Sequence, residues 1–402
     1  MSKFIILRDR NDVFRTGPMA SVTTRGLSPL SLDAPRSDVP PAPQLDTEEL
    51  APRDLRDAAR DPSIRVIARS MPTKLVEPEA GAADATPTWG ITAVGAEATN
   101  ATGSGVRVAV LDTGIDEAHP AFAGVTLNTN DFSGDGIHDG HGHGTHCAGT
   151  IFGRDVDGTR IGVARGVTDA LIGKVLGNDG SGSSEMLFQA LRWCADENAK
   201  VISMSLGFDF PGLGERLQQD GFPPLLATSI ALEAYRMNLR MFDALMDMFR
   251  AQAAFDGGTV VCAASGNESR RQIDPNFEVS ASIPAAAFDV FSVGALGEGA
   301  GGLTVANFSN TNPVLAAPGV NIVSARSGGG LRALNGTSMA CPHVAGVTAL
   351  WWEALNAAPL PATSDGVKAR LRASAVTAPL NPGTDPLDRG HGLVQAPSAS
   401  MF

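Results

Sequence analysis

The sequence predicts an α/β protein built on a central parallel sheet with helices on its faces. Residues 106–111, Val-Arg-Val-Ala-Val-Leu, form a nearly continuous apolar run, which is typical of a strand buried on both faces of a sheet. Residues 341–350 show the apolar pattern of a helix and follow a glycine-led turn. The chain has 402 residues, 43% of them hydrophobic, which is enough for one large domain and a small one.

The first 85 residues predict a small α+β domain ahead of the main domain, which we place at residues 86–402. A strand over Lys3–Leu7 is followed by a Pro-rich linker at 33–43 and by a helix that Asp46 caps and that runs to Ala59. Two strand-like segments, 64–69 and 73–76, complete this domain.

Charge and hydropathy exclude several classes of partner. The formal net charge of −12 argues against nucleic acid and against an anionic membrane surface. No run of about 18 apolar residues occurs, so no membrane-spanning helix is predicted. The apolar run Phe4–Leu7 is too short for the core of a secretory signal. We therefore expect a cytoplasmic protein, or a secreted one if a signal precedes this sequence.

The four cysteines do not form the spacing of a disulfide framework. They fall within helix and strand patterns, so we expect free thiols in the core. The residues are Cys147, Cys194, Cys262 and Cys341.

Three separated residues have the chemistry of a nucleophile, a base and an orienting acid. Ser338 stands at the start of a predicted helix, where free N–H groups and the helix dipole favour developing negative charge. A Gly-Thr-Ser turn alone also caps ordinary helices. The segment His141-Gly-His143-Gly-Thr-His146 opens a second helix, with one imidazole at its rim and another one turn deeper. Asp112 ends the buried strand, at the sheet edge where ligand crevices form.

These blocks, in the order Asp, His, Ser, resemble the subtilisin-like serine proteases, or subtilases, over about Trp89 to Ala396. The α/β-hydrolases are a poorer match because the turn reads Gly-x-Ser-x-Ala instead of Gly-x-Ser-x-Gly. His-Gly-Thr-His-Cys is similar to the proteinase K and thermitase branch, which places Cys147 beneath the catalytic histidine. The resemblance implies a three-layer subtilisin-like fold.

The resemblance also assigns roles to residues. Asp112 would orient the imidazole of His143, which would take the proton from Ser338. Asn267, after the apolar strand at 260–264, would donate its amide to the oxyanion together with the Ser338 backbone N–H. His146 would be structural.

Two further segments resemble the pair that flanks an extended substrate in subtilases. They would bind peptide backbone by strand addition, with glycines allowing close approach. The residues concerned are Gly180, Gly182, Ser205, Leu206 and Gly207. Glu268 resembles a residue at the rim of the pocket for the side chain before the cut, where its charge would favour a basic residue.

The end of the small domain, Asp61–Val66, resembles the end of a subtilase propeptide, which acts as folding chaperone and tethered inhibitor. The resemblance implies a zymogen, with a junction at Gly81–Pro87 and self-cleavage near residues 79–88. A permanent accessory domain is the alternative.

Catalysis by this chemistry needs no cofactor. The histidines at 138–146 cluster as in a zinc site, but the spacing lacks His-Glu-x-x-His, and the serine mechanism accounts better for His143. Residues 154–161 lie where many subtilases hold a structural calcium, yet they depart from the usual asparagine-containing loop. Calcium therefore stays open at this stage.

Between Gly207 and Val260 the chain is longer than a minimal subtilase. We expect a loop at 208–224 and then a long helix with an apolar stripe. The stripe consists of Met237, Met241, Leu245 and Met248. The helix is either an extended core helix, or the insertion forms a lid or partner surface beside the substrate cleft.

Together these observations predict a serine endopeptidase that works through an acyl-enzyme and is made as a zymogen. Its partners would be a protein or peptide substrate and its own N-terminal domain. A non-catalytic regulatory protein of the same fold, or an esterase or peptide ligase with the same acyl-enzyme chemistry, are the alternatives.

Overall fold

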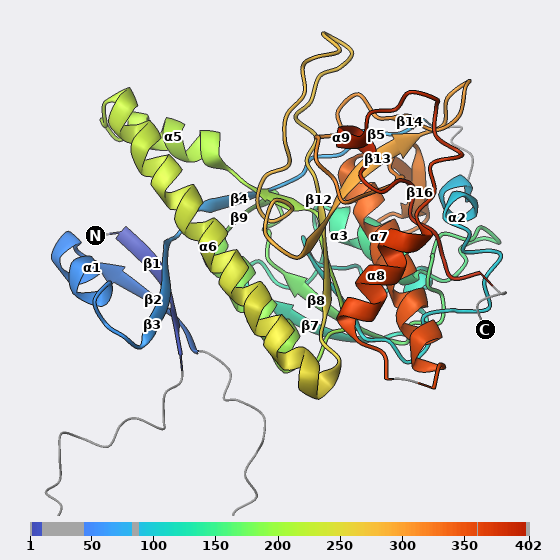
Figure 1. The fold of residues 1–402 in the computed structure, drawn as a ribbon, viewed down its shortest axis with the longest axis horizontal. Helices are drawn as coiled ribbons and strands as arrows, with labels where there is room; N and C mark the ends of the chain where they lie inside the picture. The colour runs from blue at the N-terminus through green and yellow to red at the C-terminus, as the bar shows by residue number, and fades with distance from the viewer. Residues whose placement is uncertain (1, 10–43, 83–87, 360, 399–402) are drawn as a thin grey trace, which may run out of the picture.

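The computed structural model describes residues 2–9, 44–82, 88–359 and 361–398 (Figure 1). The Pro-rich linker predicted at 33–43 and most of the predicted junction at 81–87 lie outside these residues.

A largely parallel sheet of eight strands forms the centre of the molecule. Its strands lie in the order β14-β13-β12-β10-β6-β8-β7, and β15 also pairs with β13. Every pairing in it is parallel except that of β13 with β14. The predicted strand is β6, Val108–Asp112, and all of its residues are buried. The other strands are β7 Thr126–Asp131, β8 Asp169–Lys174, β10 Val201–Met204, β12 Val260–Ala264, β13 Val290–Gly297, β14 Thr304–Val305 and β15 Leu315–Pro318.

Alternate residues of β6 belong to two different hydrophobic clusters, because successive side chains of a strand point to opposite faces. Val108 and Val110 pack in the cluster that contains α3 (His143–Phe152) and α7 (Thr337–Asn356). Ala109 and Leu111 pack in the cluster that contains α4 (Ser184–Asp196) and α6 (Pro224–Asp256). Helices therefore cover both faces, and the predicted three-layer fold is confirmed.

Smaller elements complete the chain. The short helices are α2 Trp89–Ala93, the 3-10 helix Pro120–Phe122, α8 Ser364–Ser374 and α9 Pro386–Arg389. The strands β16 (Ile322–Ala325) and β17 (Leu331–Asn335) form an antiparallel hairpin that leads into α7. No helix in the described ranges combines the length and the apolar character needed to cross a membrane.

The small N-terminal domain contains a three-stranded antiparallel sheet in the order β2-β1-β3, with helix α1 after β2. Its elements are β1 Ser2–Arg8, β2 Gln44–Leu50, α1 Pro52–Ala58 and β3 Ile64–Arg69. The prediction of a helix from Asp46 was wrong at its start, because residues 44–50 pair along the whole of β1. Acidic residues at this place are typical of the start of a helix. Here Asp46 and Glu48 instead form ion pairs with Arg8, at 3.3 and 2.9 Å.

The N-terminal sheet packs against α6, as Figure 1 shows. Ile5 and Leu7 of β1 are fully buried within the cluster that contains α4 and α6. Asn238 of α6 donates a hydrogen bond from Nδ2 to the carbonyl of Arg69 at the end of β3, at 2.8 Å. The helix thus connects the small domain to the main sheet.

The strand predicted at 73–76 exists but does not belong to the small domain. It is β4, Pro72–Leu75, and it lies antiparallel between β9 (Ser181–Ser183) and β11 (Leu206–Phe208) of the main domain. The next short strand, β5 (Glu79–Ala80), pairs with β17. The segment that follows the small domain therefore runs along the main domain.

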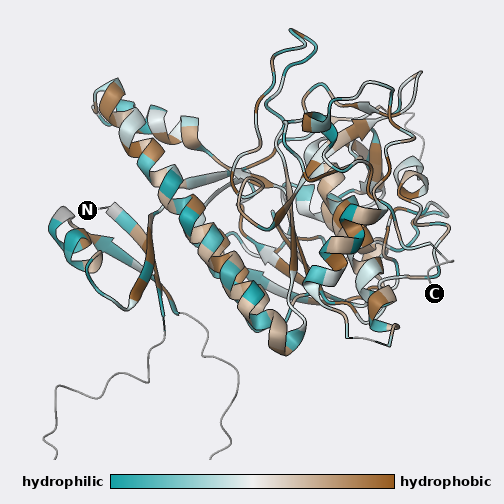
Figure 2. Ribbon diagram, in the orientation of Figure 1, coloured by the Kyte–Doolittle hydropathy of each residue, from teal (hydrophilic) through white to brown (hydrophobic). Residues whose placement is uncertain are grey.

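The insertion after β11 is a helical hairpin. The loop predicted at 208–224 was wrong, because Phe210–Gln219 forms helix α5. Asp209 caps this helix by accepting a hydrogen bond from the N–H of Gly212, and two helical glycines hid the pattern in the sequence. The predicted long helix is α6, whose polar and apolar residues alternate along its length in Figure 2. Of its stripe, Met241, Leu245 and Met248 are buried.

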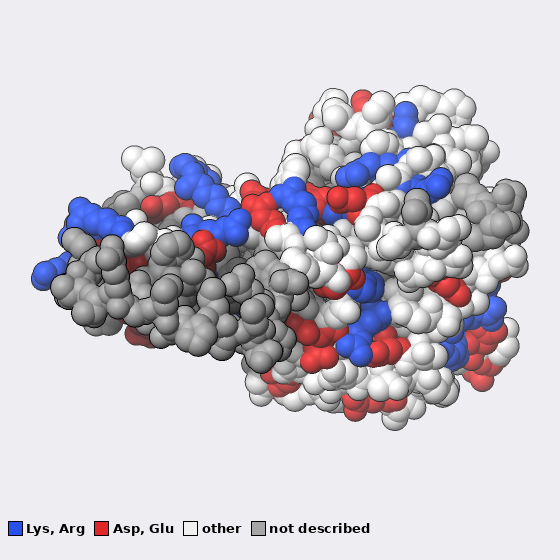
Figure 3. Space-filling view, turned by 60° about the horizontal axis from the view of Figure 1, so that its bottom comes forward, with Lys and Arg blue, Asp and Glu red and all other residues white. Residues whose placement is uncertain are grey.

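Charged side chains of both signs lie next to one another on the face shown in Figure 3. The net negative charge is therefore not gathered into one acidic patch among the described residues of this face.

We expect Phe242→Ala in α6 to lower the free energy of unfolding by about 3–5 kcal/mol, because truncating a buried aromatic side chain leaves a cavity. The Phe242 ring is fully buried and lies 5.6 Å from the ring of Phe188. Urea denaturation in a Ser338→Ala background, which lacks the predicted nucleophile, measures the loss. The control is Leu225→Ala on the same helix, where the side chain is 85% exposed and a change within about 0.5 kcal/mol is expected. Equal effects of the two substitutions would contradict the placement of α6.

Candidate active site

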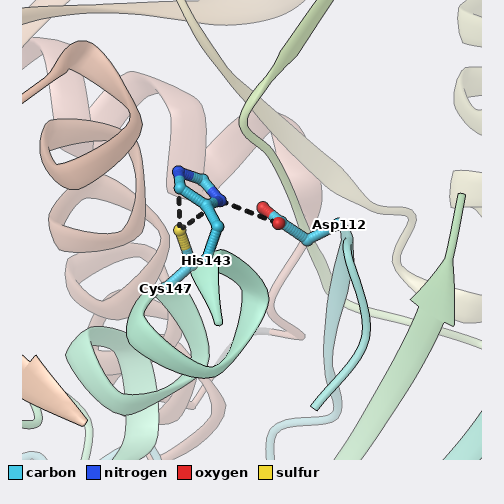
Figure 4. A group of neighbouring side chains, drawn as sticks. All are labelled: Asp112, His143 and Cys147. Atoms are coloured by element: carbon cyan, nitrogen blue, oxygen red, sulfur yellow. Dashed lines mark hydrogen bonds and ion pairs between the residues drawn. The ribbon is translucent and has the colours of Figure 1, made fainter. Parts of the chain in front are cut away.

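The predicted acid and base form a buried pair. Asp112 stands at the carboxyl end of β6, and His143 is the first residue of α3. The Nδ1 atom of His143 lies 2.8 Å from Oδ1 of Asp112, and both side chains are almost inaccessible to solvent. Figure 4 shows the ring edge-on to the carboxylate. This bond fixes the imidazole so that Nε2 is left to act as a base.

Ser338 reaches the same place from a third part of the chain. It lies in the first turn of α7, with Gly336 at the helix cap. The Sγ atom of Cys147 lies 3.7 Å from Nδ1 of His143 and 3.4 Å from the carbonyl oxygen of Ser338, so α3 and α7 meet beneath the imidazole. The three residues that the sequence analysis selected therefore converge at one end of the sheet.

Asn267, predicted to bind the oxyanion, follows β12 and faces the same cleft. Its Oδ1 accepts hydrogen bonds from the backbone N–H and the hydroxyl of Thr337, both at 2.9 Å. With the oxygen bound to Thr337, the amide NH₂ is left to donate into the cleft. A Cβ at Gly336 would lie 3.1 Å from this nitrogen, so glycine leaves room for the amide.

The cleft is filled by the chain's own segment 72–80. The N–H of Leu75 donates to the carbonyl of Gly180 at 2.9 Å, and the N–H of Val76 donates to the carbonyl of Ser205 at 3.2 Å. Thr73 pairs with Gly182, Lys74 with Gly207, and Leu75 with Leu206. All five residues predicted to bind substrate backbone therefore bind this segment by strand addition.

The nucleophile faces the carbonyl of Val76. Oγ of Ser338 donates its one hydrogen to this oxygen at 2.7 Å. The Asn267 amide donates instead to the carbonyl of the next residue, Glu77, at 2.8 Å. The predicted processing region, 79–88, lies beyond this point: Glu79 pairs with Asn335 of β17, and residues 83–87 are outside the described chain.

A polar network that the sequence analysis missed holds the acid and the base together. The buried carboxylate of Asp139 accepts hydrogen bonds from the Thr113 hydroxyl, the Gly142 N–H, and both the N–H and hydroxyl of Thr145. Burial alone would raise the pKa of Asp139, but these hydrogen bonds together lower it below its ordinary value. Asp139 stands between His138 and Gly140 in a glycine-rich stretch, whose local pattern resembles a solvated turn and does not indicate this network.

Lys174 adds a buried cation to this network. Its Nζ donates to the carbonyls of Thr113 and His138 at 2.8 and 2.9 Å and to Oδ1 of Asn178 at 2.7 Å. Burial lowers the pKa of the Lys174 ammonium. The side chain therefore joins the turn after Asp112 to the loop that precedes α3.

Asp112, His143 and Cys147 offer three potential metal ligands within 4.8 Å of one another. The hydrogen bond between the carboxylate and Nδ1 already uses the atoms that would face a metal ion. Burial, with the nearby Asp112 carboxylate, raises the pKa of the Cys147 thiol well above its ordinary value. The donor set fits a catalytic pair better than a metal centre.

The two other buried histidines near the site bind backbone carbonyls. His146 lies with Nε2 at 3.0 Å from the carbonyl of Ile322, and burial lowers its pKa to about 3. His343 of α7 lies with Nδ1 at 2.8 Å from the carbonyl of Met339, and burial lowers its pKa to about 4. Both are neutral and structural.

The loop considered for calcium is held by arginine side chains. The guanidinium of Arg154 donates to the carbonyls of Phe152, Arg165 and Val167. The carboxylate of Asp155 accepts from Arg165 at 2.9 Å. Within residues 154–161, the Asp155 carboxylate is thus paired with an arginine, which makes it less available to a calcium ion.

Glu268 lines a pocket of about 450 Å³ together with Ser280, Ser282 and Asn310. Its Oε2 accepts a hydrogen bond from Nδ2 of Asn310 at 2.7 Å. Among residues of the bound segment, Lys74 lines this pocket, two positions before Val76.

Comparison with known proteins agrees with this geometry. A sequence model described as "Subtilase family" matches residues 103–392. The chain belongs to the subtilase family. It is 30% identical over 349 residues to Subtilisin-like protease 1 of Trichophyton equinum, covering 82% of this chain and 58% of that protein. It is 33% identical to M-protease of Shouchella clausii, covering 75% of this chain and 67% of that protein.

The chain thus spans little more than half the length of some of its relatives. Another relative, Alkaline protease of Alkalihalobacillus alcalophilus, is 33% identical over 308 residues, covering 75% of this chain and 67% of that protein. Subtilases need no cofactor for catalysis.

We expect Arg154→Ala to lower the melting temperature by several degrees, because three backbone carbonyls lose their hydrogen-bond donor. Differential scanning calorimetry of Arg154→Ala beside the unsubstituted protein, both in the Ser338→Ala background, measures the loss. An unchanged melting temperature would contradict the role of Arg154 in holding this loop.

Acid should destabilise the protein through its buried histidines. The pKa of His343 is lowered from 6.5 to about 4 on folding, so the unfolded chain binds more protons between these values. The stability that the buried, neutral His343 contributes is complete above about pH 6.5 and is lost as the pH falls toward 4. Between pH 7 and 5 this residue should account for roughly 1–2 kcal/mol. Urea denaturation of Ser338→Ala with and without His343→Gln measures it, and equal slopes with pH would contradict the assignment.

Proposed function

We propose that this protein is a serine endopeptidase. The observation that carries the proposal is the buried Asp112–His143 pair with Ser338 hydrogen-bonded to a peptide carbonyl. In a substrate, Nε2 of His143 would take the proton from Ser338 as Oγ attacks the carbonyl carbon, and the oxyanion would accept a hydrogen bond from Asn267. His143 then gives the proton to the leaving amine, and water, deprotonated by the same imidazole, releases the acyl group.

The way the cleft binds its own segment favours peptide bonds over simple esters. Backbone pairing extends on both sides of Val76, through β4 with β9 and β11 and through β5 with β17. An extended chain is thus bound before and after the reacting carbonyl, which suits cleavage within a polypeptide. An esterase or a binding protein would not need this length of paired backbone beside Ser338 and the Asp112–His143 pair.

We also propose that the N-terminal domain inhibits the enzyme until it is cut off. Its covalent continuation, residues 72–80, blocks the site, and Ser338 has no accessible surface. We propose a cut between Val76 and Glu77, upstream of the region 79–88 chosen from the sequence, because Oγ of Ser338 faces the carbonyl of Val76. The Asn267 donor binds the carbonyl of Glu77, so it must move to the carbonyl of Val76 before the oxyanion can form. This mismatch would make self-cleavage slow.

We expect incubation of the full chain to release a fragment ending at Val76, detected by intact-mass spectrometry. Ser338→Ala should stay whole, because it lacks the nucleophile. Peptidase activity and labelling by a fluorophosphonate should rise in step with the cleavage, since both need an open cleft. The matched control is Ser104→Ala, an exposed serine outside the cleft-bound segment that should be processed as the wild type is.

A cut at 79–88 would overturn the assignment of Val76. A protein that reacts with the fluorophosphonate and cleaves peptides while its N-terminus remains attached would overturn the zymogen. Absence of both labelling and hydrolysis under all conditions would overturn the endopeptidase.

A further inference from the structure

Asp209, the first residue of the helical insertion, contacts the cleft-bound segment, residues 72–80. The N–H of Asp209 donates to the carbonyl of Pro72 at 2.9 Å, which continues the pairing of β11 with β4 by one residue. The carboxylate oxygen Oδ1 of Asp209 lies 3.2 Å from Nζ of Lys74. The insertion therefore contacts both the backbone and a side chain of the segment that occupies the substrate site.

The side chain of Lys74 lines a pocket that the insertion helps to build. Phe210 and Pro211 of α5 and Leu232 and Tyr235 of α6 form its walls with Phe208. The rings of Phe210 and Tyr235 meet edge to face at 6.0 Å, and the Tyr235 hydroxyl accepts a hydrogen bond from the N–H of Ile283. These contacts fix the wall, so the pocket is part of the folded protein and does not depend on its occupant.

Register and alternation assign this pocket to one position of a bound peptide. Lys74 pairs with Gly207 and stands two residues before Val76, whose carbonyl faces Ser338. Its neighbours Thr73 and Leu75 are buried, whereas Lys74 is exposed toward the insertion. A peptide bound in the same register would place its equivalent side chain against Asp209.

We propose that the insertion forms a substrate subsite for a long basic side chain two residues before the one that is cut. The aliphatic part of such a side chain packs on the apolar walls, and its cationic end pairs with Asp209. The carboxylate of Glu268 lines the same pocket and adds negative charge. This proposal rests on the proposed endopeptidase function, and it assigns the insertion a role in peptide selectivity.

The pair of peptide substrates that tests this subsite differs at one residue. The first is the p-nitroanilide of Pro-Thr-Lys-Leu-Val, which copies residues 72–76, and the second carries Glu in place of Lys. The wild type, assayed after incubation of the full chain, should prefer the Lys peptide by roughly five- to tenfold in kcat/KM, the range for a partly exposed ion pair. Because each ratio is taken within one preparation, the fraction of molecules with an open cleft cancels.

Asp209→Asn should bring the ratio close to one, and Asp209→Lys should reverse it. Asparagine caps a helix about as well as aspartate does, so this variant keeps the hydrogen bond to Gly212 and removes only the charge. The matched control is Asp220→Asn at the other end of α5, an exposed acid that should leave the ratio unchanged. The preference of the wild type should also shrink as salt is added.

The outcomes separate this inference from the function on which it rests. Hydrolysis of both peptides at equal rates, or a Lys preference that persists in Asp209→Asn, would overturn the subsite and leave the endopeptidase in place. A Lys preference that is lost in Glu268→Gln but kept in Asp209→Asn would likewise overturn the role of Asp209. Failure to hydrolyse either peptide, with no fluorophosphonate labelling of Ser338, would overturn the endopeptidase itself.

Discussion

The hydrogen bond between Asp112 and His143 requires a strand end and a helix start to meet at a fixed distance, with water excluded. A carboxylate buried in this way is costly unless its oxygens accept hydrogen bonds. Oδ1 of Asp112 also accepts from the N–H of Thr113 at 2.8 Å, and the Thr113 hydroxyl binds Asp139. The 2.8 Å pair is therefore the innermost part of a network that reaches the first turn of α3.

Two cationic side chains also help to hold Asp112 and His143 at this distance. Lys174 binds the carbonyl that follows Asp112 and the carbonyl that precedes Asp139, so one ammonium joins the two loops that carry the acid and the base. Arg154 acts similarly at the other end of α3, where its guanidinium gathers three carbonyls. Side-chain cations, which cannot dissociate from the chain, thus hold the loops at both ends of the helix that positions His143.

The parts of the structure that sequence reasoning predicted are those with local signals. The buried strand at Val108–Asp112 and the helices that begin at His143 and Thr337 follow from apolar runs and glycine-led turns. The elements that were predicted wrongly are those whose structure depends on residues far away in the sequence. Residues 44–50 form a strand because Arg8 and β1 lie beside them, and β4 leaves the small domain because Gly182 and Gly207, more than 100 residues away, pair with it. No local pattern encodes such pairings.

Under the proposed function, strand addition would let one cleft bind both an inhibitor and a substrate. Backbone hydrogen bonds hold any extended chain, so residues 72–80 are bound as a substrate would be, and binding alone does not determine whether the chain is cut. In the proposed mechanism the difference lies in one donor: the Asn267 amide would have to bind the carbonyl that Ser338 attacks, and here it binds the following one. A segment can therefore be held tightly in the ground state while the transition state lacks its main electrostatic support.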